Sequence, residues 1–314
     1  MEKKIILRLS NGLGNQMFMY ATAYSLAKRL NRKLIIDDET AFRARKNISK
    51  YALSNFEIAS EIAPNSNKFK SNIGYLKRKS FKFLDKFMIK KKFLIEQKDL
   101  NKISNYDPEI FNKDYAENLY MEGHFESEKY FLNYKNFIEK EFIFKNRDFF
   151  KKSPFHKVLR KNNSISICLR QNRFSEGMNK KNNENNVKSK KFSHEQIEYI
   201  NNSIDYFKKK ISNPVFCLWS NDIENINLND FSAKITKIIH NKEFYNSLDQ
   251  NSLDLYLITQ AKHHIVIPST FNWWGAWLCS NKEKIILRPS SNYFSQFKIN
   301  NNDFWPDTWL KINK

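Results

Sequence analysis

Apolar and polar residues follow a strand–helix–strand pattern along the first forty positions. Residues 4–9 (KIILRL) are apolar and β-branched, as in a buried strand, and the SNG that follows is turn chemistry. From Asn15 onward, apolar residues recur at helical spacing, at Met17, Tyr20, Ala21, Tyr24 and Ala27. Residues 34–36 predict a second strand, which ends at Asp37 and Asp38. This order predicts a parallel sheet whose sites lie at the carboxyl ends of its strands.

A second series of the same kind follows Ser153 and Pro154. Apolar runs and helical patterns predict strands at 164–169, 215–219, 264–267 and 284–287, and helices at 195–209 and 253–261. The chain is therefore expected to be α/β throughout, with the change of domain near residues 148–160. The predicted domains are 1–152 and 153–314.

One stretch of the second series is almost wholly polar and basic. Residues 177–193 read GMNKKNNENNVKSKKFS, which is too hydrophilic for a core. We interpret this stretch as a mobile loop that directly follows the strand at 164–169.

Composition narrows the class of protein. The chain has 314 residues, with 41% hydrophobic and 15% aromatic content, which excludes a disordered chain. No apolar run approaches the ~18–20 residues that a bilayer span needs, and Arg8 and Asn11 interrupt the apolar start, so no signal peptide is expected. Three widely spaced cysteines, Cys168, Cys217 and Cys279, suit a reducing compartment. These features predict a soluble, two-domain, cytoplasmic protein.

The net charge of +21 has several explanations. It fits a nucleic acid, a membrane surface or an anionic small substrate, but Lys, Asn, Ile and Phe also share A/T-rich codons. No nucleic-acid recognition motif is present, so no nucleic-acid partner is expected. The charge is densest at 68–92, where ten basic residues and one acid alternate with apolar residues. This stretch can lie on an anionic membrane, or it can be a solvated helix that packs inward through its phenylalanines.

A glycine loop joins the first predicted strand to its helix. Gly12 and Gly14 would let backbone N–H groups approach an anion at the helix N-terminus. The loop is not a dinucleotide fingerprint, because Met17 stands where the third glycine would be, and it is not a Walker A loop. A ligand loop and a plain tight turn remain equal alternatives.

The second domain offers several candidate anion ligands. Arg170 stands where the strand at 164–169 ends, with Arg173 close behind, and arginines there suit a diphosphate or a neighbouring carboxylate. Ser269 and Thr270 begin a predicted helix after Pro268, where they could bind phosphate or only cap the helix. The tryptophans that follow are typical of a core. His263 and His264 are adjacent and point apart, and no metal-binding motif occurs.

Five blocks of sequence together resemble one family. They are GLGNQMFMYATAYSLA (12–27), MEGHFESEKYF (121–131), SICLRQNRF (166–174), LWSND (218–222) and DLYLITQAKHHIVIPSTFNWWGAWL (254–278). The sequence resembles the bacterial alpha-1,2-fucosyltransferases of glycosyltransferase family eleven. The family's arginine motif reads H-x-R-R-x-D, and here Cys168, Gln171 and Arg173 depart from it while Arg170 is retained.

The resemblance implies inverting, metal-independent transfer of L-fucose from GDP-β-L-fucose to a galactoside hydroxyl in surface glycan biosynthesis. It implies two Rossmann-like domains that face each other across a cleft (the GT-B type), with 1–152 on the acceptor side and 153–314 binding GDP-fucose. No cofactor or metal is expected. The acceptor would be a lipid-linked glycan at the inner face of the plasma membrane. The departures from the motif also motivate an alternative, a catalytically silent nucleotide- or glycan-binding relative.

The resemblance also assigns roles to residues. Arg170 would stabilise the departing GDP, and Glu176 is the candidate base, with Asp37 and Glu126 as alternatives; Glu126 can equally be structural. Asp254 would lie near the guanine or ribose. Asn15 would position phosphate or the acceptor from across the cleft. The implied donor-binding set is Gly12, Gly14, Asn15, Arg170, Arg173, Asn221, Asp222, Asp254, Ser269 and Thr270.

Overall fold

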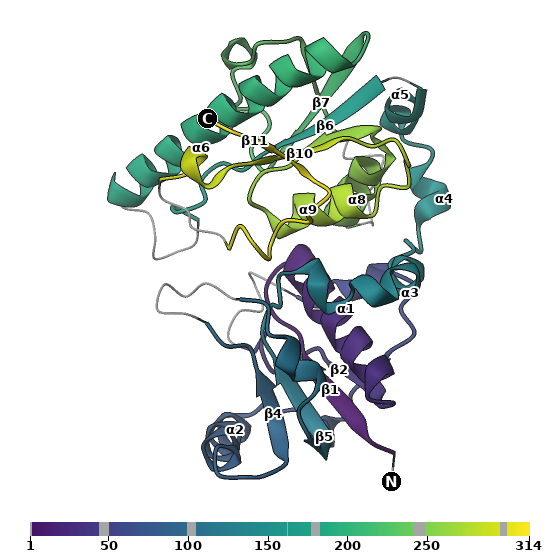
Figure 1. Cartoon of the computed structure of the whole chain (residues 1–314), viewed down its shortest axis with the longest axis vertical. Helices are drawn as coiled ribbons and strands as arrows, with labels where there is room; N and C mark the ends of the chain where they lie inside the picture. Colours follow the sequence, from purple (N-terminus) through teal and green to yellow (C-terminus); the bar gives the residue numbers. More distant parts are fainter. Residues whose placement is uncertain are drawn as a thin grey trace. The chain divides into compact units, whose positions relative to one another are not determined.

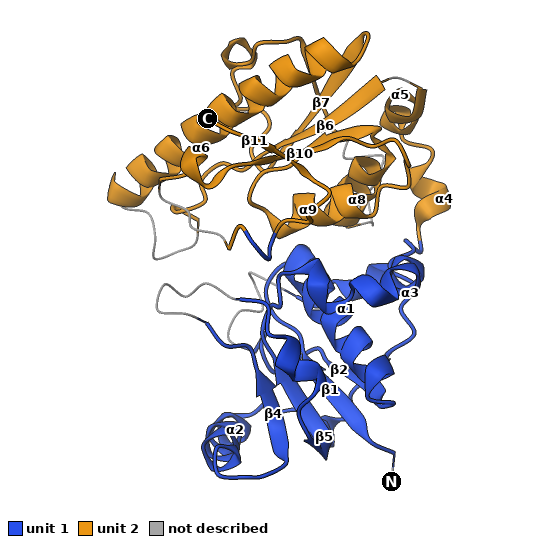
Figure 2. Cartoon of the chain, viewed as in Figure 1, with its two compact units in different colours: residues 1–145, 302–304 blue, residues 146–301, 305–314 orange. Residues whose placement is uncertain are grey.

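The computed structural model describes residues 2–43, 50–98, 105–161, 163–176, 183–240, 249–295 and 300–314. The chain divides into two compact units (Figure 2). Unit 1 holds residues 1–145 and 302–304, and unit 2 holds 146–301 and 305–314. The change of unit thus falls between Lys145 and Asn146, a few residues before the predicted position, and a short segment near the C-terminus returns to unit 1.

Unit 1 is built on a parallel five-stranded sheet in the order β3-β2-β1-β5-β4. Its strands are β1 (Lys4–Arg8), β2 (Lys33–Asp37), β3 (Glu61–Ile62), β4 (Lys91–Ile95) and β5 (Tyr115–Glu122). Its helices are α1 (Leu13–Arg29), α2 (Asn72–Asp85) and α3 (Lys135–Glu141) (Figure 1). The strands predicted at 4–9 and 34–36 and the helix between them are confirmed. Strands β3, β4 and β5 were not predicted.

Helix α1 is buried on nearly every side. Leu13, Gly14 and all residues from Gln16 to Ala27 are buried. The helix packs on β1 and β2, and on the short 3-10 segments Leu53–Asn55, Pro108–Phe111 and Glu128–Tyr130. The apolar face predicted for this helix is therefore too narrow, because these 3-10 segments cover the side of α1 that faces away from the sheet.

Unit 2 is built on a parallel six-stranded sheet in the order β11-β10-β9-β6-β7-β8. Its strands are β6 (Asn163–Leu169), β7 (Pro214–Ser220), β8 (Ile235–Lys237), β9 (His263–Ile265), β10 (Ile286–Pro289) and β11 (Leu310–Ile312). Its helices are α4 (Arg147–Phe150), α5 (Pro154–Lys161), α6 (Asn183–Lys210), α8 (Gln250–Gln260) and α9 (Thr270–Trp277). The four predicted strands and both helices of this region are confirmed; β8 and β11 were not predicted.

The order of strands in unit 2 is that of a doubly wound Rossmann sheet. The chain moves from β6 outward to β7 and β8, then returns to β9 beside β6 and continues outward to β10 and β11. Helix α6 lies on one face of the sheet, and α8 and α9 lie on the other (Figure 1). The order reverses between β6 and β9. Open sheets of this kind bind ligands at that switch point, outside the carboxyl ends of the strands.

The loop predicted at 177–193 is wrong from Asn183 onward, because these residues belong to α6. Their polar side chains form the solvated face of a long helix, while Ser189 and Phe192 are buried on the other face. The ring of Phe192 contacts those of Phe174 and Phe294, with centroids 5.9 Å and 5.3 Å apart. Residues 177–182 lie outside the described part of the chain.

The tryptophans of α9 are core residues, as predicted. Trp273 and Trp274 have no exposed surface, and the rings of Trp273 and Trp309 lie 5.4 Å apart. The inward-packing alternative for residues 68–92 is wrong for Phe83 and Phe87, whose side chains are exposed. Within the described ranges, no helix has both the length and the apolar character needed to cross a bilayer.

Candidate active site

The backbone at the end of β6 is held by the side-chain amide of Gln196 from α6. The Arg170 N–H donates to Gln196 Oε1 (2.9 Å), and Gln196 Nε2 donates to the Arg170 carbonyl (2.8 Å). Gln196 itself is fully buried. One side chain thus satisfies both polar groups of the residue that leaves the sheet, which fixes where the Arg170 side chain starts.

The next residue is held in the same way by Asn221, which follows β7. The Gln171 N–H donates to Asn221 Oδ1 (2.8 Å), and Asn221 Nδ2 donates to the Gln171 carbonyl (3.1 Å). Asn172 adopts a positive φ of 56°, and its amide lies 3.5 Å from an Asp222 carboxylate oxygen. Asn221 and Asp222, predicted to bind the donor, therefore shape the loop that carries Arg170.

Gln196 and Asn221 make the same pair of backbone hydrogen bonds, but Gln196 is buried and Asn221 is exposed. Replacing each by alanine therefore tests how burial changes the cost of losing these hydrogen bonds. Gln196→Ala should lower the free energy of unfolding by about 1–3 kcal/mol, because it leaves buried polar groups unpaired. Asn221→Ala should cost less, because water can replace its exposed amide. Urea denaturation measures both values, and amide hydrogen exchange should accelerate at Arg170 in the first variant and at Gln171 in the second. Equal losses in the two variants would contradict this difference.

The side chain of Arg170 forms an ion pair with Glu176. Arg170 NH2 lies 2.6 Å from Glu176 Oε2, and the two side chains are 38% and 40% exposed. The carboxylate alternative considered for this arginine is thus realised in the structure. An exposed pair of this kind contributes little to stability, so an incoming diphosphate can compete for the guanidinium.

The N-terminus of α9 lies beside this loop, since β9 and β6 are neighbours in the sheet. Ser269 is the residue before the helix, and its hydroxyl makes no capping bond to the first turn. Capping alone therefore does not explain Ser269. The first-turn N–H groups of a helix have no acceptor within the helix, which makes this end, with Ser269 and Thr270, suitable for an anion.

A partly buried polar cluster lies behind the same edge. Asp254 in α8 is 2.7 Å from Nε2 of His240, which follows β8. Burial and the nearby Asp254 carboxylate raise the pKa of the Cys168 thiol on β6, and a hydrogen bond with Asn272 partly opposes this. The thiol is therefore neutral at pH 7. Asn272 in α9 is itself buried, and its Oδ1 atom has no hydrogen-bond partner in the described structure.

Unit 1 carries the remaining predicted residues at the end of β1. The positive φ of the turn falls on Asn11 (62°) and not on Gly12, and a Cβ added at Gly12 would meet nothing within 4 Å. A tight turn therefore does not require the glycine at position 12, while an exposed backbone there suits close approach of a ligand. Gly14 and Asn15 lie in the first turn of α1.

A polar chain joins the ends of β1 and β5. Asn11 Nδ2 lies 2.7 Å from Nε2 of His124, whose Nδ1 lies 3.4 Å from Glu126 Oε1. Both His124 and Glu126 are partly exposed. Gly123 has a φ of 150°, and a Cβ there would meet Cβ of Glu96 at 2.3 Å, so only glycine fits. The backbone at this position therefore requires the glycine between Glu122 and His124 in the second sequence block.

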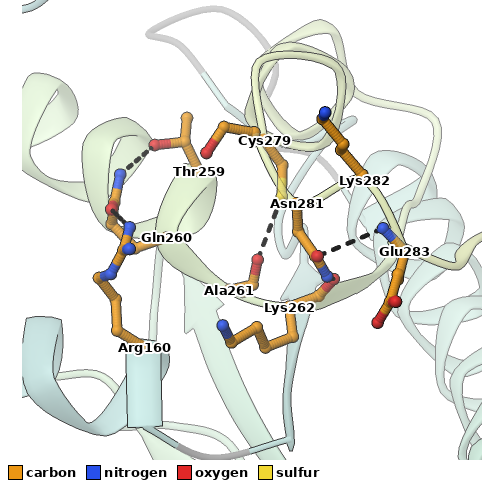
Figure 3. Close-up of a pocket in the computed structure, with 10 residues that line it drawn as sticks. Arg160, Thr259, Gln260, Ala261, Lys262, Cys279, Asn281, Lys282 and Glu283 are labelled. Carbon is orange, nitrogen blue, oxygen red and sulfur yellow. Dashed lines mark hydrogen bonds between the residues drawn. The ribbon is translucent and has the colours of Figure 1, made fainter.

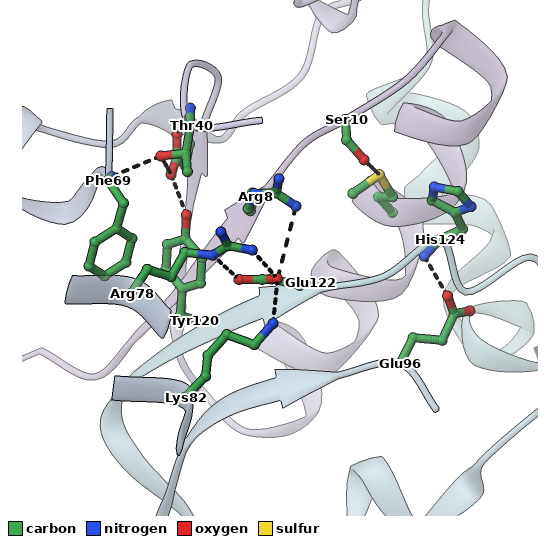
Figure 4. A network of polar contacts seen from close by, with 12 residues as sticks. Arg8, Ser10, Thr40, Phe69, Arg78, Lys82, Glu96, Tyr120, Glu122 and His124 are labelled. Atoms are coloured by element: carbon green, nitrogen blue, oxygen red, sulfur yellow. Dashed lines mark hydrogen bonds and ion pairs between the residues drawn. The ribbon is translucent and has the colours of Figure 1, made fainter. Parts of the chain in front are cut away.

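Asp37, one of the candidate bases, is structural. It is fully buried, and its carboxylate accepts hydrogen bonds from the hydroxyls of Tyr120 and Thr40 and from two backbone N–H groups. A carboxylate with all these donors and no exposure cannot reach an acceptor sugar. Figure 4 shows this part of unit 1, together with Glu122 among Arg8, Arg78 and Lys82.

A hollow at the opposite edge of unit 2 contains none of the predicted residues. It is lined by the end of α8, the segment after α9 and Arg160 of α5 (Figure 3). These segments precede the strands and so lie at their amino ends, away from the switch point. In the described ranges, no three His, Cys, Asp or Glu side chains form a group that could hold a metal ion.

Sequence reasoning missed Gln196, Asn272, His240 and His124. Gln196 is a polar residue in an amphipathic helix, and nothing in the sequence indicates that its side chain contacts the end of β6. His124 was within a recognised block, but its contact with Asn11 needs the pairing of β1 with β5, which was not predicted.

The comparisons with known proteins agree with this architecture. The model of Glycosyl transferase family 11 matches residues 2–313. An alpha-1,2-colitosyltransferase of Escherichia coli is 28% identical over 314 residues, covering 99% of each chain. The O-antigen biosynthesis glycosyltransferase WbnK of Escherichia coli is 23% identical over 321 residues, covering 97% of this chain and 99% of that one.

Among solved structures, a point mutant of Arabidopsis thaliana FUT1 in complex with GDP is similar in fold. The TM-score is 0.56 at 12% identity, and the match covers 93% of this chain and 72% of that one. The family model spans almost the whole chain, and the two curated relatives align end to end. The protein therefore belongs to glycosyltransferase family 11.

Proposed function

We propose that this glycosyltransferase moves L-fucose from GDP-β-L-fucose to a galactoside hydroxyl, with inversion to an α-1,2 linkage and without a metal ion. The observation that carries the proposal is the position of Arg170. It leaves the sheet at the switch point of unit 2, with its backbone fixed by Gln196 and its side chain paired only to an exposed carboxylate among the described residues. This is where a doubly wound sheet holds a ligand.

The proposed reaction is a single displacement at the anomeric carbon. The acceptor oxygen bonds to C1 of the sugar from the face opposite to the leaving group, and the bond from C1 to the β-phosphate oxygen breaks with its electron pair going to GDP. Arg170 and the N-terminus of α9 with Ser269 stabilise the charge that develops on the diphosphate. A guanidinium in this position supplies the charge that a metal supplies in other transferases.

The acceptor hydroxyl must lose a proton during this step. Two of the candidate carboxylates are partly exposed, Glu176 in unit 2 and Glu126 in unit 1. Glu176 has one oxygen on Arg170, and Glu126 lies beside His124. Replacing the true base by glutamine removes the proton acceptor but keeps the shape, so Glu176→Gln and Glu126→Gln separate the two assignments by which one loses turnover.

One comparison suggests a second candidate donor, GDP-colitose, because the relative with 28% identity is named a colitosyltransferase. Colitose is the 3-deoxy counterpart of fucose. A site that hydrogen-bonds the 3-hydroxyl of fucose strongly rejects a donor without it, whereas an apolar site accepts either one. Parallel turnover assays with GDP-fucose and GDP-colitose therefore identify the donor, and we expect GDP-fucose to be preferred.

The remaining alternative is a relative that binds nucleotide without catalysis, motivated by Cys168, Gln171 and Arg173. Titration calorimetry with GDP and GDP-fucose, combined with a GDP-release assay on a panel of galactosides, distinguishes the two. We expect binding together with release, and linkage analysis of the product should show an α-1,2 bond. Binding of both ligands without release on any galactoside would refute the proposed transfer.

The proposal includes the facing arrangement of the two units, with the acceptor bound on unit 1. It also includes a role in surface glycan assembly, supported by the relative WbnK, which is named an O-antigen biosynthesis glycosyltransferase. A bound-donor structure tests the first point. It should show the diphosphate on Arg170 and α9, with the sugar directed toward the exposed backbone at Gly12.

A further inference from the structure

Helix α2 turns one arginine and one aspartate toward the protein. Its buried residues are Arg78 and Asp85, which lie seven positions apart and therefore share one face. Arg78 donates to both carboxylate oxygens of Glu122, at 2.6 Å and 2.8 Å. Asp85 accepts from the backbone N–H groups of Lys92 and Phe93. Polar contacts thus hold the helix to unit 1.

The opposite face of α2 and the turn after it are apolar and exposed. The exposed fractions are 78% for Ile73, 63% for Leu76, 60% for Phe83, 57% for Leu84, 75% for Phe87, 45% for Met88 and 94% for Ile89. We call these seven residues the α2 face. An amphipathic helix of a soluble domain ordinarily buries this side. A contiguous exposed patch of this kind marks an interaction surface.

Lysines border the α2 face on both sides. At ~100° per residue, Lys79 and Lys86 lie along one side of it and Lys77 along the other. Among the described residues no carboxylate pairs with any of these three lysines, whereas the nearby Lys82 and Lys90 bind Glu122 and Asp114. Lys77 and Lys79 instead lie over the rings of Phe81 and Tyr75, at 5.4 Å and 4.9 Å from the ring centroids. Such contacts are weak at exposed sites, so an anionic group can compete for these ammonium groups, whose long stems reach past the apolar side chains.

We propose that the α2 face docks on an anionic lipid surface, with α2 lying in the plane of the membrane interface. The apolar side chains would enter the boundary between head groups and acyl chains, and the three lysines would contact anionic head groups. A second copy of the chain fits this surface less well, because pairing two such faces brings their lysines together. The docking does not depend on the proposed transfer reaction.

Sedimentation of the full chain with lipid vesicles tests the proposal. We expect binding at low salt to vesicles of phosphatidylcholine with phosphatidylglycerol, loss of binding at high salt, and little binding to pure phosphatidylcholine. The variant Leu76→Ser/Phe83→Ser/Phe87→Ser should weaken the partition by about 100-fold or more. It should still fold, because all three side chains are exposed. The matched control Phe137→Ser, also at an exposed position but in α3, should bind like wild type.

The lysines provide an independent arm of the test. The variant Lys77→Gln/Lys79→Gln/Lys86→Gln should lose about fivefold in partition per lysine at low salt. The same number of glutamines placed at Lys140, Lys209 and Lys210, which are also exposed, should cost less. Equal losses would mean that net charge alone drives binding, and the proposal would be wrong.

Two further outcomes would overturn the proposal. One is the absence of binding to anionic vesicles at low salt, or equal binding to neutral vesicles. The other is a dimer in light scattering that the triple serine variant converts to a monomer, since the α2 face would then be covered by a second copy. Turnover of a water-soluble galactoside should be unchanged in the serine variant, so loss of docking is distinguishable from failure of the proposed transfer.

Discussion

Replacement of Arg170 by lysine should lower turnover of GDP-fucose by about 100-fold or more. Lysine keeps the positive charge but loses the planar fork that holds two diphosphate oxygens at once. A donor that acts on charge developing in the transition state contributes ~3–4 kcal/mol. Because this stabilisation arises mainly in the transition state, kcat should fall far more than the donor KM rises. Steady-state GDP release at saturating acceptor measures both.

Two controls separate this effect from misfolding. The thermal midpoint of Arg170→Lys should stay close to that of wild type, because the ion pair with Glu176 is exposed. Arg160→Lys alters an exposed arginine at the amino edge of the same sheet, bonded to Gln260, and should keep turnover. Near-normal kcat in Arg170→Lys would remove the basis of the proposed mechanism.

The largest stability effect is expected at Glu122, which ends β5. Its carboxylate binds Arg78 through two hydrogen bonds, and Lys82 and Arg8 lie 3.2 Å and 3.9 Å away. Glu122→Gln keeps the shape but leaves these cations without their anion. Breaking a buried pair in this way costs about 3–5 kcal/mol. Urea denaturation at pH 7 should show this loss, whereas Asp114→Asn, at an exposed pair with Lys90, should change stability little.

The effect of Glu122 should also depend on pH. Burial alone would raise the pKa of this carboxyl, but the Arg78 guanidinium and the other cations outweigh it and hold the pKa below its ordinary value. A depressed folded-state pKa gives stability that is present above the unfolded value, near 4.3, and is lost as pH falls through the folded value. The difference in the free energy of unfolding between wild type and Glu122→Gln should therefore become smaller as the pH falls below about 4. A difference that stays constant down to pH 3 would contradict the assignment.

The sequence predicted those elements whose apolar residues are continuous. The strand at 215–219 is an unbroken apolar run, and only the small buried residues Ser164 and Ser166 interrupt the apolar residues of the strand at 164–169. Both are central strands of a parallel sheet, which are covered on both faces. Strand β4 was not predicted, because it lies at the edge of its sheet, begins with two lysines and is only partly buried. Helix α6 was cut short because its first two turns are polar apart from one buried face.

The sequence was sufficient to predict at which edge of the sheet the candidate site lies. Arg170, Asn221 and Ser269 each follow a strand, and parallel strands bring their carboxyl ends to one edge. The contacts of these residues were not predictable, because they depend on which helix residue faces which strand end. Asn221 was expected at the donor, and its contacts with the backbone of Gln171 were not predicted. The apolar face of α2 was visible in the sequence, but its pattern does not say whether that face is covered.

The return of residues 302–304 to unit 1 limits how the protein can be cut. Asp303 accepts hydrogen bonds from the backbone of Tyr106 and from Lys129, at 3.0 Å and 2.7 Å, and the ring of Phe304 contacts that of Phe18. A fragment that stops at Lys145 would lack all of these partners. The chain therefore passes between the units three times, and production of unit 1 by itself would need residues 302–304 to be joined to it by a designed linker.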